Sequence, residues 1–521
     1  MACFNLYGRS YYFVNGNWVD CNNNRVSHSL AYDLNTKYPN AASLSDKKPI
    51  AQIKKAIKQR KTAPKQNFEY PKKNSSFNSS SESQSYKRKY RPRTTPRKDV
   101  SYTDLTVSQQ KALKILESGV NVFLTGEAGT GKSYVLREYI RRNREKNIIV
   151  CAPTGVAAIN IGGSTLHRVF GVPLGAIKPG DSNKNPSDAV KKANTIIIDE
   201  ISMCRFDVFE YVVRTIINAT EQMPINGQVK KQLIVVGDFY QLPPVITPSD
   251  KEYFDEYWGK DKVGLGYAFL SPLWKEMNFT NIILSEIVRQ NDIEMIKNLN
   301  KVRIGDYTGI DWFNQNAVRE SLPDGIYLCG SNRKADDINE RKAASLSEEG
   351  KEYRAEISGE VKDTDKITTD VLLLKKNMQV MTLINNSEKG YQNGSMGTIT
   401  KLGSNGVEIK LRDGKLVKVE PYEWEIADYE VQDEQVVSVV AGKYKQLPLR
   451  MAYAITIHKS QGQTYSSANI YPDCFSPGQL YVALSRVRSI RDMNLEHRIT
   501  RSSLKTSEEV QHFYDNLVNS V

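Results

Sequence analysis

The chain has 521 residues, 40% of them hydrophobic, and a formal net charge of +13. A chain of this length can bury several cores, and it contains no apolar run near the roughly 20 residues that cross a bilayer. The start lacks the layout of a signal peptide, and the six cysteines form no C-x-x-C pair, so we expect a soluble, non-secreted protein with neither a zinc site nor a disulfide framework.

Residues 1–45 are predicted to form a small module whose role the sequence does not indicate. Asn15 and Gly16 stand between two apolar runs, which is a strong signal for a two-residue hairpin turn. A module of this size is expected to be marginally stable alone.

Residues 46–100 hold the basic excess of the chain. From Lys47 to Lys98 there are 17 Lys or Arg and two acids, a balance of +15, which leaves about −2 for residues 99–521. Because this segment has too few aliphatic residues to offset chain entropy by burial, we expect a disordered tether. Tyrosines among the basic residues favour a polyanion-binding arm, and a solvated spacer is the alternative.

A phosphate-binding loop opens the first predicted lobe, at residues 101–284. The sequence Gly-Glu-Ala-Gly-Thr-Gly-Lys-Ser at 126–133 follows an apolar run and precedes a stretch with helical spacing, a context that a plain glycine-rich turn does not explain. Backbone N–H groups of such a loop surround nucleotide phosphates. The residues expected to bind ATP are Gly126, Ala128, Gly129, Thr130, Gly131, Lys132 and Ser133. Lys132 is expected to reach the β- and γ-phosphates, and Ser133 to hold Mg²⁺.

Two further polar segments follow apolar runs, and a parallel sheet would bring them to the edge that carries this loop. Asp199 and Glu200 follow the run 195–198; Asp199 is expected to hold Mg²⁺ and Glu200 to polarise the attacking water. Acids that cap a helix after a buried strand are the alternative. Asp238 and Gln241 follow a second run and are candidates for sensing the γ-phosphate, with a turn around two prolines as the alternative.

Alternating strand and helix patterns from residue 101 onward are typical of a doubly wound α/β fold with parallel sheets. The predicted strands are 121–125, 147–152, 195–198, 233–237, 281–284, 325–329 and 468–471. Residues 377–450 break the pattern, because the runs 407–412 and 415–420 alternate in period two around Asp413-Gly414. They predict a hairpin inside a small all-β insertion.

Six segments carry motifs that occur in a fixed order: Ala152–Phe170, Asp199–Met203, Gly237–Pro244, Leu284–Gln290, Ile455–Thr464 and Gly478–Val487. Together they resemble the helicase motifs of the petite integration frequency (Pif) family, which are RecD-like superfamily one DNA helicases. The resemblance extends from about Leu105 to Arg488, roughly three quarters of the chain. Residues 1–100 match no pattern of the family.

The resemblance implies two RecA-like lobes that bind ATP and Mg²⁺ between them, with the second lobe at 285–376 and 451–521. It also implies a short wedge insertion at about 171–192 and an SH3-like β-barrel, for which 377–450 is the candidate. The implied activity is ATP-driven, 5′-to-3′ translocation of a monomer on single-stranded DNA, with unwinding of duplexes at junctions.

By the same likeness, Gln109 reads adenine, and Arg289 and Arg486 act as arginine fingers that reach the γ-phosphate from the second lobe. A guanidinium suits that role because it neutralises charge that spreads over the transferring phosphoryl group. A surface ion pair is the alternative for each arginine.

The residues expected to bind DNA lie in boxes that line the strand channel of similar helicases: Thr154, His167, Thr456, His458 and Lys459. Their hydroxyl, imidazole and ammonium groups are all competent phosphate partners. A structural histidine is the alternative for both histidines. Phe170 and Tyr481 are candidates for base stacking, although an aromatic side chain beside apolar neighbours is more often part of a core.

Two other classes of function stay open at this point. One is an ATP-driven switch that changes its grip on nucleic acid without unwinding, and the other is a noncatalytic DNA-binding scaffold, which the complete set of catalytic residues disfavours. The cytoplasm of a bacterial or phage-infected cell is the expected location, with the nucleus as the alternative.

Overall fold

The computed structural model describes residues 105–221, 231–287 and 292–518, together with the backbone of three short strands near the N-terminus. The predicted tether at 46–100 and the predicted finger Arg289 lie outside the described residues. The chain divides into two compact units, Met1–Lys87 and Arg88–Val521.

The first unit contains a three-stranded antiparallel sheet formed by β1 (Cys3–Leu6), β2 (Arg9–Val14) and β3 (Asn17–Val19). Val14 of β2 pairs with Asn17 of β3 in an antiparallel hairpin, on either side of the predicted Asn15-Gly16 turn, which itself lies outside the described residues. The hairpin predicted from this dipeptide is confirmed.

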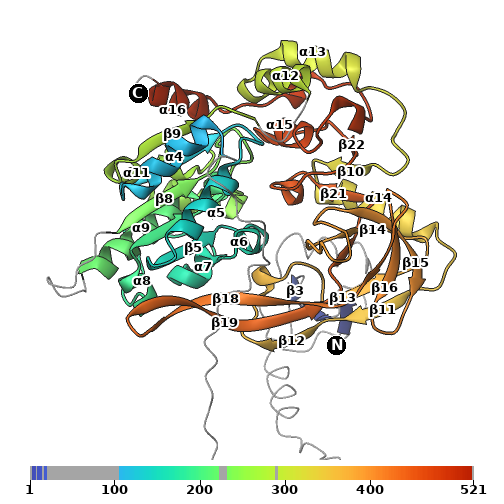
Figure 1. Ribbon diagram of the computed structural model, residues 1–521, viewed down its shortest axis with the longest axis horizontal. Helices are drawn as coiled ribbons and strands as arrows, with labels where there is room; N and C mark the ends of the chain where they lie inside the picture. The colour runs from blue at the N-terminus through green and yellow to red at the C-terminus, as the bar shows by residue number, and fades with distance from the viewer. Residues whose placement is uncertain are drawn as a thin grey trace, which may run out of the picture. The chain divides into compact units, whose positions relative to one another are not determined.

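The first lobe of the second unit contains a six-stranded parallel sheet in the order β6-β5-β7-β8-β4-β9 (Figure 1). Its strands are β4 (Val122–Gly126), β5 (Ile148–Ala152), β6 (Ser164–Thr165), β7 (Thr195–Ile198), β8 (Gln232–Val236) and β9 (Thr280–Leu284). Its helices are α4 (Val107–Glu117), α5 (Lys132–Arg142), α6 (Gly155–Ile161), α7 (Leu166–Phe170), α8 (Asp188–Lys192), α9 (Phe206–Glu221), α10 (Pro248–Tyr257) and α11 (Pro272–Glu276). The five predicted strands of this region are confirmed to within one residue.

The sheet of the first lobe is buried on both faces. β4, β7 and β8 have no exposed residue, which explains why they appear in the sequence as continuous apolar runs rather than as alternating patterns. β7, β8 and β4 are neighbours, so the loops that follow their carboxyl ends meet at one edge. In parallel α/β sheets, ligands bind at this edge.

The second lobe contains a four-stranded parallel sheet in the order β21-β10-β22-β23. Its strands are β10 (Ile326–Cys329), β21 (Ala454–Thr456), β22 (Ala468–Ile470) and β23 (Met493–Leu495), and its helices are α12 (Ile293–Ile304), α13 (Tyr307–Asn316), α14 (Asn332–Ala344) and α15 (Gln479–Leu484). β10 and β22 confirm the two strands predicted here.

Antiparallel sheets separate the two halves of the second lobe. The strands are β11 (Lys351–Arg354), β12 (Glu356–Gly359), β13 (Val371–Leu374), β14 (Gln379–Thr382), β15 (Met396–Leu402), β16 (Val407–Leu411), β17 (Leu416–Val419), β18 (Tyr422–Gln432), β19 (Gln435–Gln446) and β20 (Leu449–Met451). β16 and β17 pair as the predicted hairpin, and a five-stranded sheet runs in the order β17-β16-β15-β14-β20. The antiparallel strands begin at Lys351, before the predicted boundary at 377, because β12 pairs with β19 and β11 with β13.

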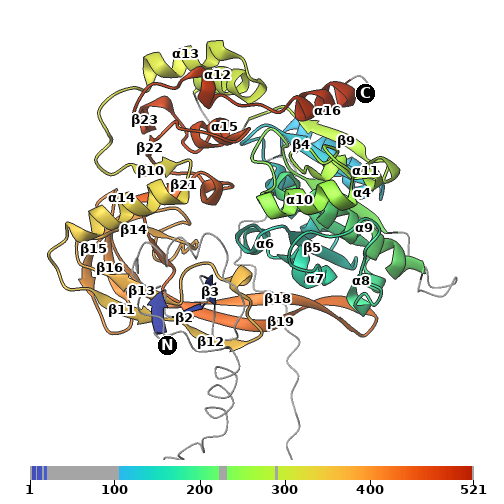
Figure 2. The same ribbon diagram turned by 180° about the vertical axis from the view of Figure 1, so that it is seen from behind.

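Two elements reach from the second half of the chain to the first lobe. The β18–β19 hairpin extends as a two-stranded arm along the lobe (Figures 1 and 2), where the Tyr429 hydroxyl donates to Val150 O and accepts from Val150 N, both at 3.1 Å. The last helix, α16 (Glu508–Val518), follows the second lobe in sequence but packs beside β9 of the first lobe in both views. None of the helices in the described part of the chain has the length and apolar character that a bilayer crossing requires.

Candidate functional site

The loop between β4 and α5 has the backbone of a phosphate-binding loop. Gly126, Gly129 and Gly131 have φ angles of 146°, 90° and 85°, which L side chains rarely adopt. A Cβ on Gly126 would lie 2.5 Å from Leu284 O, and one on Gly131 would lie 2.6 Å from Gln109 Nε2. Because α5 begins directly after Gly131, its free N–H groups and positive end face this loop.

Two side chains of the loop donate hydrogen bonds to its own backbone carbonyl groups. Lys132 Nζ donates to the carbonyl oxygens of Gly126 at 2.9 Å and Glu127 at 3.0 Å, so the ammonium lies across the loop. Thr130 Oγ1 donates to Glu127 O at 2.9 Å. Ser133, in the first turn of α5, lines the same cavity as Asp199. The loop therefore offers a cation, backbone N–H donors and a hydroxyl, the groups that bind a nucleoside triphosphate and its Mg²⁺.

Gln109 is hydrogen-bonded to the phosphate-binding loop. Its side-chain Oε1 accepts from Thr106 N at 3.1 Å in the capping box of α4, and its Nε2 donates to Thr130 O at 3.0 Å. The side chain is 2% exposed. In this structure both ends of the amide are bonded, so adenine recognition by Gln109 stays a prediction that requires an exchange of partners.

Two carboxylates stand at the carboxyl end of β7. Burial and the adjacent charge of Glu200 raise the pKa of Asp199 above its ordinary value. Glu200 has a φ of 53°, a conformation that costs about 1–3 kcal/mol in a residue other than glycine and that persists only where the surroundings impose it. A buried acid beside a second acid is stabilised in its charged form by a cation, so Asp199 and Ser133 fit a Mg²⁺ site.

Two hydrogen bonds from the second lobe reach the phosphate-binding loop and Glu200. Gln461 Nε2, in the segment after β21, donates to Glu200 Oε2 at 3.1 Å. Tyr481, in α15, accepts a hydrogen bond at its hydroxyl from Ala128 N at 2.8 Å. One backbone N–H of the phosphate-binding loop is therefore held by a side chain from the opposite lobe.

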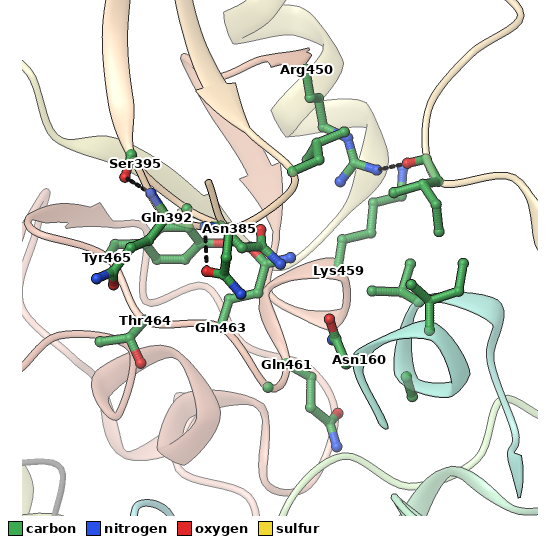
Figure 3. A pocket seen from close by; sticks show the side chains of 18 of the residues that line it. Asn160, Asn385, Gln392, Ser395, Arg450, Lys459, Gln461, Gln463, Thr464 and Tyr465 are labelled. Atoms are coloured by element: carbon green, nitrogen blue, oxygen red, sulfur yellow. Dashed lines mark hydrogen bonds between the residues drawn. The ribbon is translucent and has the colours of Figure 1, made fainter. Parts of the chain in front are cut away.

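A cavity of about 1000 Å³ begins at Ser133, Asp199 and Glu200 and continues between the first lobe, the β insertion and the second lobe (Figure 3). Amide and cationic side chains dominate its labelled wall: Asn160, Asn385, Gln392, Gln461, Gln463, Arg450 and Lys459. Asn160 comes from the first lobe, Asn385 and Gln392 from the loop between β14 and β15, and the others from the strand-and-loop segment 449–466. All three parts of the second unit thus line one cavity with the carboxylates of Asp199 and Glu200.

Comparison with known proteins identifies the family. The model of the PIF1-like helicase family matches residues 104–314. The ATP-dependent DNA helicase Pif1 of Bdellovibrio bacteriovorus is 31% identical over 431 residues, which cover 79% of this chain and 92% of that protein. This chain belongs to the PIF1-like helicase family.

Solved structures agree with this family assignment. The crystal structure of Bacteroides sp Pif1 in complex with ADP-AlF4 matches with a TM-score of 0.71 and 33% identity, covering 80% of this chain and 97% of that one. The crystal structure of Bacteroides Pif1 bound to ssDNA matches with a TM-score of 0.58 and 34% identity over 80% of this chain and 97% of that one. The predicted family and fold class are confirmed: two parallel-sheet lobes with an antiparallel β insertion.

In this PIF1-like chain, Arg486 is bonded within its own lobe. The side chain is 1% exposed, and its Nε donates to Val482 O at 2.7 Å. Its Nη1 donates to the carbonyl oxygens of Ser460 at 3.1 Å and Gln463 at 3.2 Å. The guanidinium therefore supports the loop that carries Gln461 to Glu200, and its role as an arginine finger stays a prediction.

The Asp238 carboxylate is bonded to side chains from two other elements. It is fully buried and accepts from Arg303 Nη2 at 2.9 Å and from Tyr514 Oη at 3.3 Å. Direct sensing of the γ-phosphate by Asp238 therefore stays a prediction that requires an exchange of partners, since both of its oxygens are bonded to other side chains. Gln241, whose backbone N donates to Asp238 O at 2.9 Å, stays the candidate sensor.

The predicted DNA-binding residues divide into two groups. Thr154, His458 and Lys459 line the cavity, whereas His167 and Thr456 lie outside it. Thr456 is 5% exposed, and its hydroxyl accepts from Lys459 N at 3.3 Å. Burial lowers the pKa of His458, and burial with nearby Arg205 lowers that of His167, so neither histidine favours its cationic form.

The two aromatic candidates for base stacking have other roles. Phe170 is fully buried in the core of the first lobe. Tyr481 is 3% exposed and bonds the phosphate-binding loop instead. The alternative that both are core residues is the better description.

Sequence reasoning missed the amide side chains of the cavity. Gln461 and Gln463 lie in the motif Ile455–Thr464, which was already expected to line the DNA channel. Their alternation with the small residues at 462 and 464 could have indicated that both amides point into that channel. Asn385 and Gln392 gave no local signal, because the loop between β14 and β15 reaches the cavity only through the fold of the insertion.

Proposed function

We propose that this chain is an ATP-dependent DNA helicase that moves 5′-to-3′ on single-stranded DNA and unwinds duplexes at junctions, in DNA replication, repair or recombination. Family membership supports the activity, and the direction of movement rests on the resemblance of the six motifs. The observation that carries the proposal is the hydrogen bond from Gln461 to Glu200, because it joins the predicted catalytic base to the loop that faces the cavity.

The chemistry follows from the residues around the phosphate-binding loop. Lys132 and the backbone N–H groups of 129–133 bind the phosphates, and Glu200 accepts the proton of the attacking water. Ser133 and Asp199 would hold Mg²⁺, which supplies neutralising charge on the phosphate oxygens. Gln241 contacts the γ-phosphate, and Arg486 and Arg289 complete the site when the lobes close.

The DNA strand is proposed to occupy the cavity of Figure 3, with Thr154, His458 and Lys459 on its phosphates. Amides such as Asn385 and Gln392 offer both donors and acceptors, so they suit base edges of any sequence. Closure of the lobes on ATP would move Gln461 and the strand-facing loop together, which couples hydrolysis to movement.

We further propose that the active form is a monomer and that it acts in the cytoplasm of a bacterial or phage-infected cell, or in a nucleus.

Strand displacement on partial duplexes tests the proposal. A duplex with a 5′ single-stranded tail should be unwound in the presence of ATP, and one with a 3′ tail should not. Glu200→Gln serves as the matched control, since it should bind ATP and DNA but displace no strand. DNA-stimulated ATP hydrolysis without displacement of either duplex would instead identify a switch that changes grip without unwinding.

A further inference from the structure

The C-terminal helix α16 is part of the core of the first lobe. The Phe513 ring lies 4.3 Å from that of Phe269 and 5.4 Å from that of Phe239, measured between ring centroids. At the start of the helix, Glu509 Oε2 accepts from Leu265 N at 3.4 Å. The chain thus leaves the second lobe and adds its last helix to the first, directly behind the loop that follows β8.

Tyr514 of this helix joins the ends of two strands. Its hydroxyl lies 2.7 Å from Thr125 Oγ1, at the end of β4, and accepts from Phe239 N at 3.2 Å, just after β8. It also lies 3.3 Å from Asp238 Oδ1. One hydroxyl therefore contacts both the strand that leads into the phosphate-binding loop and the loop 238–241 that carries Gln241.

Arg303 completes this group from the opposite lobe. It stands near the end of α12, and its Nη2 and Nε donate to the two carboxylate oxygens of Asp238 at 2.9 and 3.2 Å. Its Cζ lies 4.2 Å from the ring centre of Tyr240 and 5.4 Å from that of Tyr514. The two tyrosine rings stack on each other at 4.8 Å, and the Tyr240 hydroxyl donates to Gln511 Oε1 at 3.0 Å.

Electrostatics make this contact between the lobes specific. The side chain of Arg303 is 12% exposed and that of Asp238 is fully buried. Burial lowers the pKa of Arg303, but the Asp238 carboxylate, Tyr481 and Tyr514 together outweigh that effect, so the pKa is raised. Removal of either partner would leave a buried charge without compensation. Arg303 also opposes the effect of burial on the pKa of Glu127 in the phosphate-binding loop, so it acts on both segments that face the nucleotide.

We propose that Arg303 and Tyr514 are positioning residues that couple movement of the second lobe to the loop 238–241. Arg303 moves with α12, and its bidentate bond carries that movement to Asp238. The Gln241 N–H is bonded to Asp238 O, and the backbone of Gly478 in the second lobe packs against the same loop, where an added Cβ would lie 2.4 Å from Gln241 O. Tyr514 holds the other side of Asp238 against β4. A shift of the second lobe therefore changes where Gln241 stands relative to the γ-phosphate.

The experiment uses the full chain, four substitutions at three positions and one control variant. Tyr514→Phe removes the hydroxyl and keeps the ring stack, Arg303→Gln removes the bidentate ion pair, and Gln511→Ala removes the bond to Tyr240 at an exposed position where folding is not at risk. Tyr444→Phe is the matched control, because it also removes a buried tyrosine hydroxyl, one that donates to Thr368 O at 2.9 Å in the β insertion.

The first readout needs no DNA: the ratio of the Kd for ADP to the Kd for a non-hydrolysable ATP analogue, which reports recognition of the γ-phosphate. We expect this ratio to fall about 3- to 10-fold in Tyr514→Phe and further in Arg303→Gln, the size expected for the loss of one hydrogen bond or of a charged pair. Gln511→Ala should change it in the same direction by a smaller factor. Arg303→Lys should not restore it, because an ammonium cannot form the bidentate bond.

The second readout is the number of base pairs unwound per ATP, which should fall in Tyr514→Phe and Arg303→Gln and stay unchanged in Tyr444→Phe. The proposal is overturned if Tyr514→Phe lowers the Tm as much as Tyr444→Phe does and both variants keep the parental ratio of the two Kd values. Arg303 and Tyr514 would then have only a structural role. A parent that hydrolyses ATP without unwinding would contradict the proposed helicase function alone, since the nucleotide ratio still decides the role of Arg303 and Tyr514.

Discussion

Arg486→Ala should destabilise the second lobe and weaken DNA binding in addition to abolishing DNA-stimulated ATP hydrolysis. The guanidinium satisfies the carbonyl oxygens of Val482, Ser460 and Gln463, and it is 1% exposed. Each buried acceptor left unpaired costs about 1–3 kcal/mol. With partial relaxation, we expect a total loss of about 3–5 kcal/mol in the free energy of unfolding. For a unit that spans Arg88–Val521, an unfolding entropy of about 2.1 cal/mol/K per residue corresponds to roughly 1 °C per kcal/mol, so the Tm should fall by about 3–5 °C.

Three measurements separate this scaffold role from that of a finger: the Tm, the affinity for single-stranded DNA without nucleotide, and the DNA-stimulated turnover. Affinity should fall several-fold, because Ser460 and Gln463 belong to the loop that contains Lys459 and Gln461. Arg488→Ala is the control for stability, since Arg488 is exposed and its loss should change the free energy of unfolding by no more than about 0.5 kcal/mol. The reasoning is refuted if Arg486→Ala keeps the parental Tm and DNA affinity while losing only turnover.

Three further outcomes are expected. Glu200→Gln should lower ATP hydrolysis by roughly 10²-fold or more with ATP binding retained, whereas Lys132→Ala should also weaken binding in an equilibrium assay; near-normal turnover of Glu200→Gln would show that another group is the base. Asp199→Asn should raise the Tm of the nucleotide-free protein. The pKa of Asp199 is raised in the folded state, so its ionisation destabilises that state once the pH exceeds the pKa of the unfolded chain, about 4. The gain should therefore be larger at pH 8 than at pH 5 in thermal melts, and a gain independent of pH would argue against this cause. Removal of residues 1–98, which carry a balance of about +15, should leave maximal ATP hydrolysis at saturating DNA unchanged. If the segment makes four phosphate contacts, the slope of log affinity against log salt should flatten by roughly 2.8. An unchanged slope would mean that the segment is a spacer, a receptor-read address or a protein-docking segment instead.

Local pattern was enough to predict the elements that bind nucleotide. The strand at 195–198 was located to the residue, because a strand buried on both faces must be apolar throughout and its end is marked by the acids that follow. The phosphate-binding loop could also be recognised in the sequence. Glycine is required at 126 and 131 because the φ angles are positive and because Leu284 and Gln109 approach too closely for a side chain. Such constraints act over a few residues and therefore leave a signature in the sequence.

Contacts between segments that are distant in the sequence decided which partners the remaining polar side chains bind. Tyr481 was a candidate for stacking on bases, but its hydroxyl bonds Ala128, 353 positions earlier in the chain. Asp238 was expected to face the γ-phosphate, but Arg303 and Tyr514 occupy its oxygens from 65 and 276 positions away. A side chain's residue type limits which bonds it can form, and only the packing of the lobes determines which partner comes within reach. The sequence alone therefore determined most of the parallel strands, the glycine-rich loop and the family, whereas the tertiary structure decided which partners the polar side chains bind and which of them hold the two lobes together.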